Sequence, residues 1–291
     1  MSKLPKQLTF NRGGQTLSGK VLRVNAEIML DDGRRVFRNL TESDMAAGTE
    51  PAHVEMTTPS WTVNQKFDFM ASLIRMVIDE VTCSLVITGS GGLGKTSAVL
   101  KALKEANLRD DQYTVLKGYT TPKGFYEFLY RNNGQLIIVD DCDSVFDTDT
   151  GINILKGALD SYDTRTICWA SREMSRGEDD VPSSFEFTGR IIFISNLTQE
   201  DIPQPIRSRS LNIDLTMNTS ERIERIEHLL PALASSEGVG IGMAREAFEL
   251  LKENKSRVRD INIRTMVMTL RVRKTAGIDW KGLALFQLIH N

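Results

Sequence analysis

The chain has 291 residues, enough for one large domain or two domains with a substantial buried core. Hydrophobic residues make up 41% and charged residues 25% of the sequence, which excludes an intrinsically disordered chain. The formal net charge of −2 excludes a protein that coats polyanions through a global basic field, so any nucleic-acid contact must come from a local patch.

Cysteine usage and hydropathy indicate the compartment. The three cysteines, Cys83, Cys142 and Cys168, have wide spacings that build neither a disulfide framework nor a zinc motif of the CxxC type. No stretch approaches the roughly 18 consecutive apolar residues that span a bilayer, and the first residues lack an apolar signal core. We therefore expect a cytoplasmic protein with no membrane partner.

Residues 1–50 are predicted to form a small β-rich N-terminal domain, because short apolar runs alternate with turn signals. The Asp-Asp-Gly step at 31–33 lies between two such runs and predicts a β-hairpin. Pro51 and Pro59 lie in a stretch without periodicity, so residues 51–60 are predicted to be a linker.

Residues 61–217 alternate between helical and strand patterns, which predicts an α/β domain. Helices are expected at 67–80, 96–108 and 122–132, and strands at 83–89, 113–118, 135–141, 165–171, 189–196 and 211–217. This order implies a parallel sheet with helices on both faces. Residues 218–291 are predicted to be all-helical, with helices at 220–233, 243–254, 261–275 and 280–290.

The sequence GSGGLGKT at 89–96 matches the phosphate-binding pattern GxxxxGK[ST] between an apolar strand and a helix. Glycines let several backbone N–H groups converge on phosphate oxygens, and the helix directs its positive end at them. Lys95 is expected to contact the β and γ phosphates, and Thr96 to place its hydroxyl on Mg²⁺. The alternative is a glycine-rich turn without a ligand. The predicted nucleotide-binding residues here are Gly89, Ser90, Gly91, Gly92, Leu93, Gly94, Lys95, Thr96 and Ser97.

Two acidic residues follow the apolar strand Leu136 to Val139. Asp140 would lie at the carboxyl end of this strand beside the phosphate-binding loop, where a magnesium-side carboxylate is needed. Asp141 is the candidate for polarising the attacking water. The alternative for this acidic pair is a solvated turn.

Together these motifs resemble those of the AAA+ ATPases. In that family a later strand ends in a polar sensor, and the run GRIIFISN at 189–196 ends in Asn196, whose amide can both accept and donate hydrogen bonds. The resemblance implies an α/β fold class: a P-loop parallel sheet with flanking helices (the AAA+ core), followed by an all-helical lid domain and preceded by a small β N-terminal domain. It also implies that the protein hydrolyses ATP. ATP and Mg²⁺ would bind to the α/β domain at residues 61–217, and residues 218–291 would form the lid domain.

The resemblance assigns three further arginines. The segment DIPQPIRSRS at 201–210 resembles the arginine-finger region, in which Arg209, or Arg207, would reach the γ-phosphate held by a neighbouring subunit. That role implies a homo-oligomer, a hexamer in this family. RDINIRTM at 259–266 resembles the sensor-2 region and places Arg264 at the nucleotide. The alternative for the arginines at 207 and 209 is a surface cation at a solvated helix end.

Three segments are candidates for contact with the substrate. Tyr119 stands where ring-forming members carry an aromatic pore loop, and it could grip a polypeptide or stack on a base; the alternative is a tyrosine packed at a strand end. Residues 163–189 resemble the hairpin inserted before sensor 1 in one division of the family, with Arg172 and Arg176 near its tip. The basic cluster between Lys255 and Lys274 is the best local site for nucleic acid, unless it is a solvated helix face.

Several phrases, among them KGYTTPKGFY and FEFTGRIIFISN, look similar to small AAA+ ATPases of large tailed bacteriophages, which implies the host cytoplasm. The expected function is ATP hydrolysis at the interfaces of a ring that remodels DNA or a nucleoprotein complex. One alternative is an unfoldase that threads a protein substrate. Another is an ATP-dependent assembly switch with slow hydrolysis, because Asp141 stands where most members have the longer glutamate.

Overall fold

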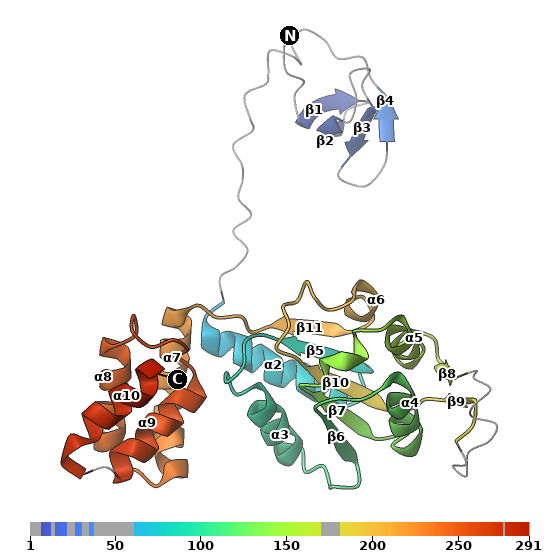
Figure 1. Cartoon of the computed structure of the whole chain (residues 1–291). Helices are drawn as coiled ribbons and strands as arrows, with labels where there is room; N and C mark the ends of the chain where they lie inside the picture. Colours follow the sequence, from blue (N-terminus) through green and yellow to red (C-terminus); the bar gives the residue numbers. More distant parts are fainter. Residues whose placement is uncertain are drawn as a thin grey trace. The chain divides into compact units, whose positions relative to one another are not determined.

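The computed structural model describes residues 61–169, 181–275 and 277–290, together with four strands between residues 7 and 37. The chain divides into two compact units, residues 1–60 and residues 61–291. Figure 1 shows the helices and strands of each unit.

The first unit contains an antiparallel sheet with the strand order β1-β2-β3-β4. The strands are β1 (Gln7–Arg12), β2 (Gln15–Val21), β3 (Glu27–Leu30) and β4 (Arg35–Phe37). β3 and β4 pair antiparallel across the predicted hairpin, with Ile28 opposite Val36. The turn at 31–33 and the linker predicted at 51–60 lie outside the described residues.

A five-stranded parallel sheet forms the centre of the second unit, with the strand order β11-β5-β10-β7-β6 (Figure 1). Its strands are β5 (Ser84–Thr88), β6 (Tyr113–Lys117), β7 (Leu136–Asp140), β10 (Arg190–Ile194) and β11 (Leu211–Asp214). Every residue of β5 and β7 is buried, as expected for central strands of a sheet covered on both faces. The predicted α/β fold class is confirmed.

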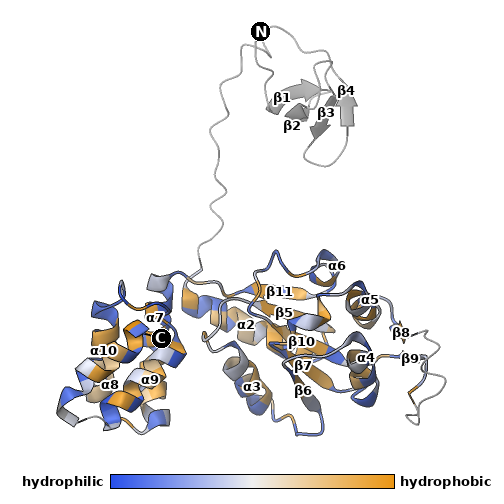
Figure 2. Ribbon diagram, in the orientation of Figure 1, coloured by the Kyte–Doolittle hydropathy of each residue, from blue (hydrophilic) through white to orange (hydrophobic). Residues whose placement is uncertain are grey.

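Alternate residues of each central strand pack into different hydrophobic clusters, because successive side chains of a strand point to opposite faces. Ile137 and Val139 belong to one cluster with helices α4 and α5, whereas Leu136 and Ile138 belong to the other with α2 and α3. The apolar strands between helices with polar outer surfaces are visible in Figure 2. The helices are α2 (Val63–Ile78), α3 (Lys95–Glu105), α4 (Pro122–Arg131) and α5 (Asp149–Ala158).

The strand predicted at 165–171 is present in a shorter form and lies outside the parallel sheet. β8 (Thr166–Cys168) instead pairs antiparallel with β9 (Ser184–Glu186) in a separate two-stranded sheet. Only the middle residue of β8, Ile167, is buried, so the strand has one apolar face and cannot fill the interior of a covered sheet. Both strands lie within residues 163–189, where the sequence predicts a hairpin.

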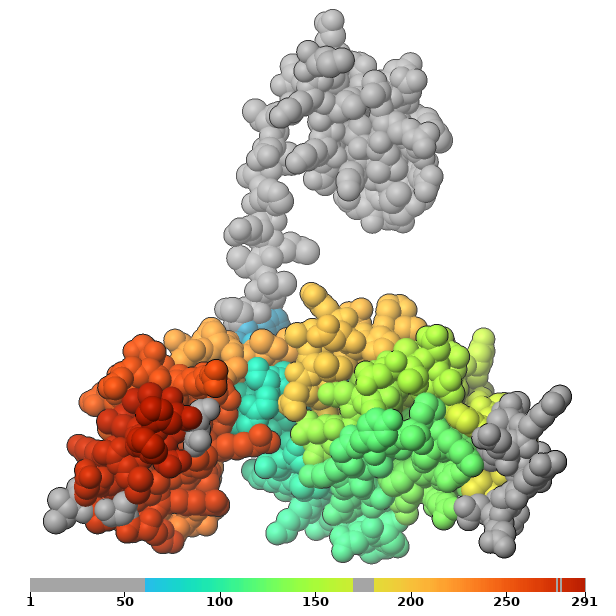
Figure 3. Space-filling model, in the orientation of Figure 1, coloured from blue at the N-terminus to red at the C-terminus, as the bar shows by residue number. Residues whose placement is uncertain are grey.

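Four helices follow the sheet and share a hydrophobic cluster of their own. They are α7 (Thr219–Glu237), α8 (Ile241–Glu253), α9 (Ile263–Thr275) and α10 (Trp280–His290), with a short 3-10 turn η3 (Gly277–Asp279) between the last two. This helical region, orange to red, adjoins the α/β region in Figure 3. Among the described residues, no helix has the length and apolarity needed to cross a membrane.

Candidate active site

The loop between β5 and α3 has a backbone that glycine alone tolerates at several positions. Gly89, Gly92 and Gly94 have φ values of +130°, +75° and +87°. A Cβ on Gly89 would meet the backbone carbon of Leu215 at 2.9 Å, and one on Gly92 would meet Asn262 Cγ at 2.7 Å. Gly94 is the N-cap of α3, so the unpaired N–H groups of the helix begin at this loop, as an anion site requires.

Lys95 is the first residue of α3 and is only 5% exposed. Its Nζ donates to the carbonyl oxygens of Gly89 and Ser90, the latter at 3.0 Å, and to Asn196 Oδ1 at 3.0 Å. Burial lowers the pKa of Lys95, and the nearby carboxylates of Asp141 and Asp140 oppose that shift. Three oxygen acceptors thus hold the ammonium group over the loop, and phosphate oxygens of a bound nucleotide could take their place as its hydrogen-bond partners.

The two predicted magnesium ligands lie side by side. Thr96 Oγ1 donates to Asp140 Oδ1 at 2.7 Å, and Asp140 is buried at the carboxyl end of β7. A hydroxyl and a carboxylate oxygen at one point are the donor set that Mg²⁺ accepts beside phosphate, so these residues fit the ion. The described residues contain no group of three or more His, Cys, Asp or Glu that could hold a metal alone.

Lys117 also reaches Asp140, which the sequence interpretation missed. Its Nζ lies 2.8 Å from Asp140 Oδ2. β6 and β7 pair in a register that puts Lys117 opposite Asp140, so both side chains leave the sheet at the same edge. A signal existed in the sequence, because Lys117 ends the strand that precedes the acidic one.

Asp141 and Asn196 complete the loop-side edge of the site. Asp141 has φ +51°, a left-handed conformation that is uncommon outside glycine, and such strain often accompanies functional positions. Asn196 Nδ2 donates to Asp141 Oδ1 at 2.7 Å while its Oδ1 accepts from Lys95. The amide uses its donor and its acceptor together, toward two side chains of the site.

Lys95, Thr96, Asp141 and Asn196 border one pocket of about 150 Å³, and Asp140 is bonded to Thr96 but is not among the lining residues. Arg264 at the start of α9 borders it from the helical region, and its charge also contributes to the lowered pKa of Lys95. The pocket therefore joins the loop, two strand ends and the helical region. Its lining residues are Gly92, Leu93, Gly94, Lys95, Thr96, Ser97, Asp141, Ile194, Asn196, Ile263 and Arg264.

Arg207 and Arg209 do not line this pocket. They lie at the end of α6 (Gln204–Arg207) and just after it, where Arg209 is exposed and donates to the carbonyl of Pro205 at 3.1 Å. Asn212 Nδ2 donates to the carbonyls of Arg207 and Ser210, at 2.8 and 2.6 Å, and so holds the turn that carries both arginines.

Of the residues predicted to contact the substrate in the loop after β6 and in the hairpin, the structure describes Tyr119. Tyr119 is 77% exposed in the loop between β6 and α4, so it is not a tyrosine packed at a strand end. Arg172 and Arg176 lie outside the described residues.

Part of the basic cluster between Lys255 and Lys274 is occupied by contacts within the helical region. Arg271 pairs with Glu237, Arg273 pairs with Glu246, and Lys274 donates to a backbone carbonyl. This leaves a smaller exposed basic group than the sequence indicates, with Lys255, Arg257 and Arg259 at its amino end.

No family model matches the chain. It is 30% identical over 241 residues to an uncharacterised 36.7 kDa protein encoded in the nrdC-mobD intergenic region of enterobacteria phage T4. That alignment covers 76% of this chain and 73% of the phage protein. The chain belongs to the family of this phage protein.

Among solved structures, a variant of RuvB from Thermotoga maritima is similar at 12% identity and a TM-score of 0.49, covering 77% of this chain and 69% of that one. A second, described as the RuvB Holliday junction branch migration motor of the same organism, has 15% identity and a TM-score of 0.38, covering 76% and 70%.

Proposed function

We propose that this protein is an AAA+ ATPase that binds ATP with Mg²⁺ and hydrolyses it at the interfaces of a ring oligomer. The observation that carries the proposal is the convergence of Lys95, Asp141 and Asn196 on one pocket at the N-terminus of α3. A phosphate-binding loop, an acidic strand end and a polar sensor are the parts that phosphoryl transfer needs, since its catalysis depends on positioning and charge.

Each residue has a proposed role in hydrolysis. Loop N–H groups and Lys95 bind the β and γ phosphates, and Thr96 and Asp140 hold Mg²⁺, which supplies charge neutralisation when bound. Asp141 accepts a proton from, or orients, the attacking water, and Asn196 holds Asp141 in place through the bond already present between them. Arg264 contacts the nucleotide from the helical region.

The position of the arginine segment supports an oligomer. Among the described residues, the cations that line the pocket are Lys95 and Arg264. Arg209 is exposed and outside the pocket of its own chain, so it is available to the pocket of a neighbouring subunit. Arg207 is the second candidate for that role. A hexameric ring is the assembly proposed.

The proposed substrate is DNA or a nucleoprotein complex, in the host cytoplasm if the protein is phage-encoded like its relative. Tyr119 supports this choice, because it is exposed between Lys117 and Lys123, whose side chains are 62% and 48% exposed while they pair with Asp140 and Glu127. An aromatic face with flanking cations suits a single strand of nucleic acid. The same exposed tyrosine favours a protein-threading unfoldase as the second candidate function.

Nucleotide binding is tested with Lys95→Ala. We expect ATP affinity to fall by about 100-fold or more, because a charge-assisted contact to phosphate is lost from a buried site. Lys101→Ala is the matched control, since Lys101 lies on the same helix and pairs with Glu105 at the surface. Equal ATP affinity in both variants would contradict the proposed site.

The substrate is tested by ATPase stimulation with single-stranded DNA, duplex DNA, RNA and an unfolded protein. We expect stimulation by DNA that weakens steeply with salt and is lost in Tyr119→Ala. Stimulation by unfolded protein alone would favour the unfoldase. Assembly driven by ATP that then stays unhydrolysed would favour the switch, for which the short Asp141 side chain is the argument.

A further inference from the structure

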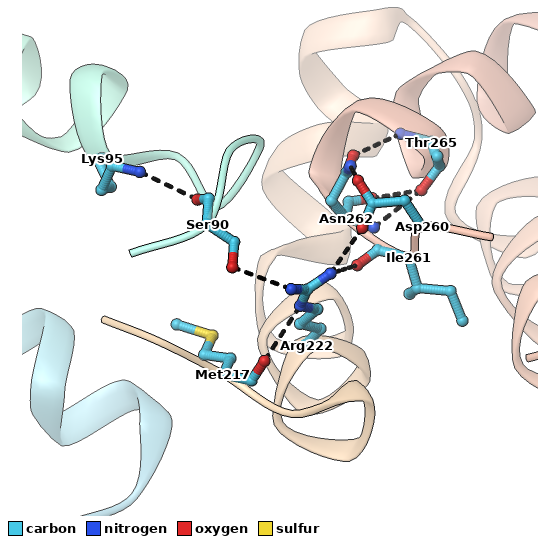
Figure 4. Close-up of polar contacts among 8 residues, drawn as sticks. All are labelled: Ser90, Lys95, Met217, Arg222, Asp260, Ile261, Asn262 and Thr265. Carbon is cyan, nitrogen blue, oxygen red and sulfur yellow. Dashed lines mark hydrogen bonds and ion pairs between the residues drawn. The ribbon is translucent and has the colours of Figure 1, made fainter. Parts of the chain in front are cut away.

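One guanidinium group joins the phosphate-binding loop to the helical region. Arg222, in the first turn of α7, is 19% exposed and directs its nitrogens at three separate segments (Figure 4). Nη2 donates to Ser90 Oγ at 3.1 Å, and Nε donates to the carbonyl of Met217 at 3.2 Å. Nη1 donates to Asp260 Oδ1 at 2.6 Å. The loop, the connection between the two regions and the segment before α9 therefore share one donor group.

The segment before α9 touches the loop a second time. Ile263 N–H donates to the carbonyl of Gly92 at 3.0 Å, and the buried side chain of Asn262 lies directly over the Cα of Gly92. Asp260 links the two contacts, because its second oxygen accepts from Asn262 Nδ2 at 2.6 Å (Figure 4).

Asn262 in turn precedes α9 and bonds to its first turn. Its Oδ1 accepts from the N–H of Thr265 at 3.0 Å, and its N–H donates to Thr265 Oγ1 at 2.9 Å. Arg264 lies inside this turn, so its position relative to the pocket depends on the segment that Arg222 and Asp260 hold. A multidentate guanidinium is well suited to fix such a geometry, because its donors have a rigid planar arrangement.

We infer that Arg222 is a positioning residue of the nucleotide site: it ties Ser90 of the phosphate-binding loop to the segment 260–263 and thereby fixes Arg264 at the pocket. The inference rests on the proposed nucleotide site. Two consequences follow. Substituting Arg222 and Ser90 together should weaken nucleotide affinity no more than substituting Arg222 alone. The contribution of Arg264 to nucleotide affinity should depend on the presence of Arg222.

The test is a double-mutant cycle in the full-length protein, read as the Kd for a non-hydrolysable ATP analogue. We expect Arg222→Ala to weaken binding about 10-fold and Ser90→Ala about 3-fold, with the double variant no weaker than Arg222→Ala. We also expect Arg264→Ala to weaken binding in the wild-type background and to have little further effect beside Arg222→Ala.

Arg271→Ala is the matched control, because Arg271 also pairs with a carboxylate on the helical region but lies far along α9 from the loop. It should leave the Kd unchanged. If Arg222→Ala does not fold, the same double-mutant cycle is measured with Arg222→Lys in its place. Arg222→Lys keeps the charge beside Asp260, and Ser90→Ala keeps every backbone contact of the loop. Melting temperatures measured alongside separate a loss of fold from a loss of coupling.

The inference would be overturned if the effects on Kd of substituting Arg222 and Ser90, and of substituting Arg222 and Arg264, were both additive. It would also be overturned if Arg222→Ala had the same Kd as Arg271→Ala. In either case Lys95→Ala would still weaken binding by about 100-fold or more if the proposed function holds. If Lys95→Ala also binds normally, the proposed function itself fails. The two failures are therefore distinguishable.

Discussion

The nucleotide pocket and the arginine segment after α6 differ in how much of their surroundings one chain supplies. In the pocket, Lys95 and Asn196 have partners within the chain. Arg209, in contrast, is exposed and donates only to a carbonyl of its own turn among the contacts of the described residues. Under the proposed function, this exposed guanidinium serves the pocket of a neighbouring subunit. One subunit should therefore suffice for binding ATP, whereas turnover should need two.

The largest difference between an effect on ATP binding and an effect on turnover is expected for Arg209→Ala. Binding of ATP should stay within about twofold, and turnover should fall by about 100-fold or more, because a cation that stabilises transition-state charge is lost. Arg109→Ala is the control, since Arg109 is an exposed arginine that pairs with its neighbour Asp111. ATPase rates at saturating ATP check this expectation, and an undiminished rate in Arg209→Ala would leave the arginine as a surface cation.

A change inside the pocket should also reduce turnover, although Arg209 is then intact in every subunit. Asp141→Asn keeps a hydrogen-bond acceptor for Asn196 but removes the charge that would polarise water. We expect a loss of turnover of about 10–100-fold with ATP affinity retained. Single-turnover measurements check the chemical step, and a normal rate would assign the polarising role to another group.

A smaller effect is expected where the two regions are connected. Gln199 Oε1 accepts from Thr88 at the end of β5, and its Nε2 donates to Asn212, which holds the carbonyls of the arginine turn. Asn212→Ala should therefore reduce turnover about 3–10-fold while ATP binding is unchanged, since the turn loses two hydrogen bonds. Unchanged turnover would mean that the turn is held by its backbone alone.

The smallest effect concerns stability. Burial raises the pKa of Asp143, with the Asp141 charge adding to the shift and a hydrogen bond from Ser195 opposing it. Because the raised pKa belongs to the folded state, ionising Asp143 costs stability as pH rises through the interval between its ordinary and its raised value. Asp143→Asn should raise Tm by about 1–3 °C at pH 7 and have no such effect below the ordinary pKa of aspartate. Thermal melts at both pH values check the sign.

Local patterns predicted most of the fold and the centre of the site. The loop 89–96 and Asp140 follow continuous apolar runs, so their places at the ends of buried strands were readable from the chain. The helix α5 was missed because its sequence includes Gly151 and Gly157, which weaken a helical pattern. The strand predicted at 165–171 is shorter than expected, and it pairs with a second strand inside the segment 163–189 where the sequence indicated a hairpin.

The hydrogen bonds that connect distant parts of the chain were not predictable in the same way. Arg222 and Ser90 are 132 positions apart, and their hydrogen bond depends on how the helical region packs on the loop. In sequence, Arg222 is one charged residue among many on an amphipathic helix, and no local spacing distinguishes it. Lys117 is an intermediate case, since strand register alone brings it to Asp140.

Mixing two inactive variants tests whether each working site is shared by two subunits. Lys95→Ala lacks a working pocket but keeps Arg209, and Arg209→Ala has the converse defect. Random co-assembly of equal amounts should pair an intact pocket with an intact arginine at about one interface in four, so the mixture should regain about a quarter of the wild-type ATPase rate. A mixture that co-assembles yet hydrolyses ATP no faster than the two variants do separately would contradict the account.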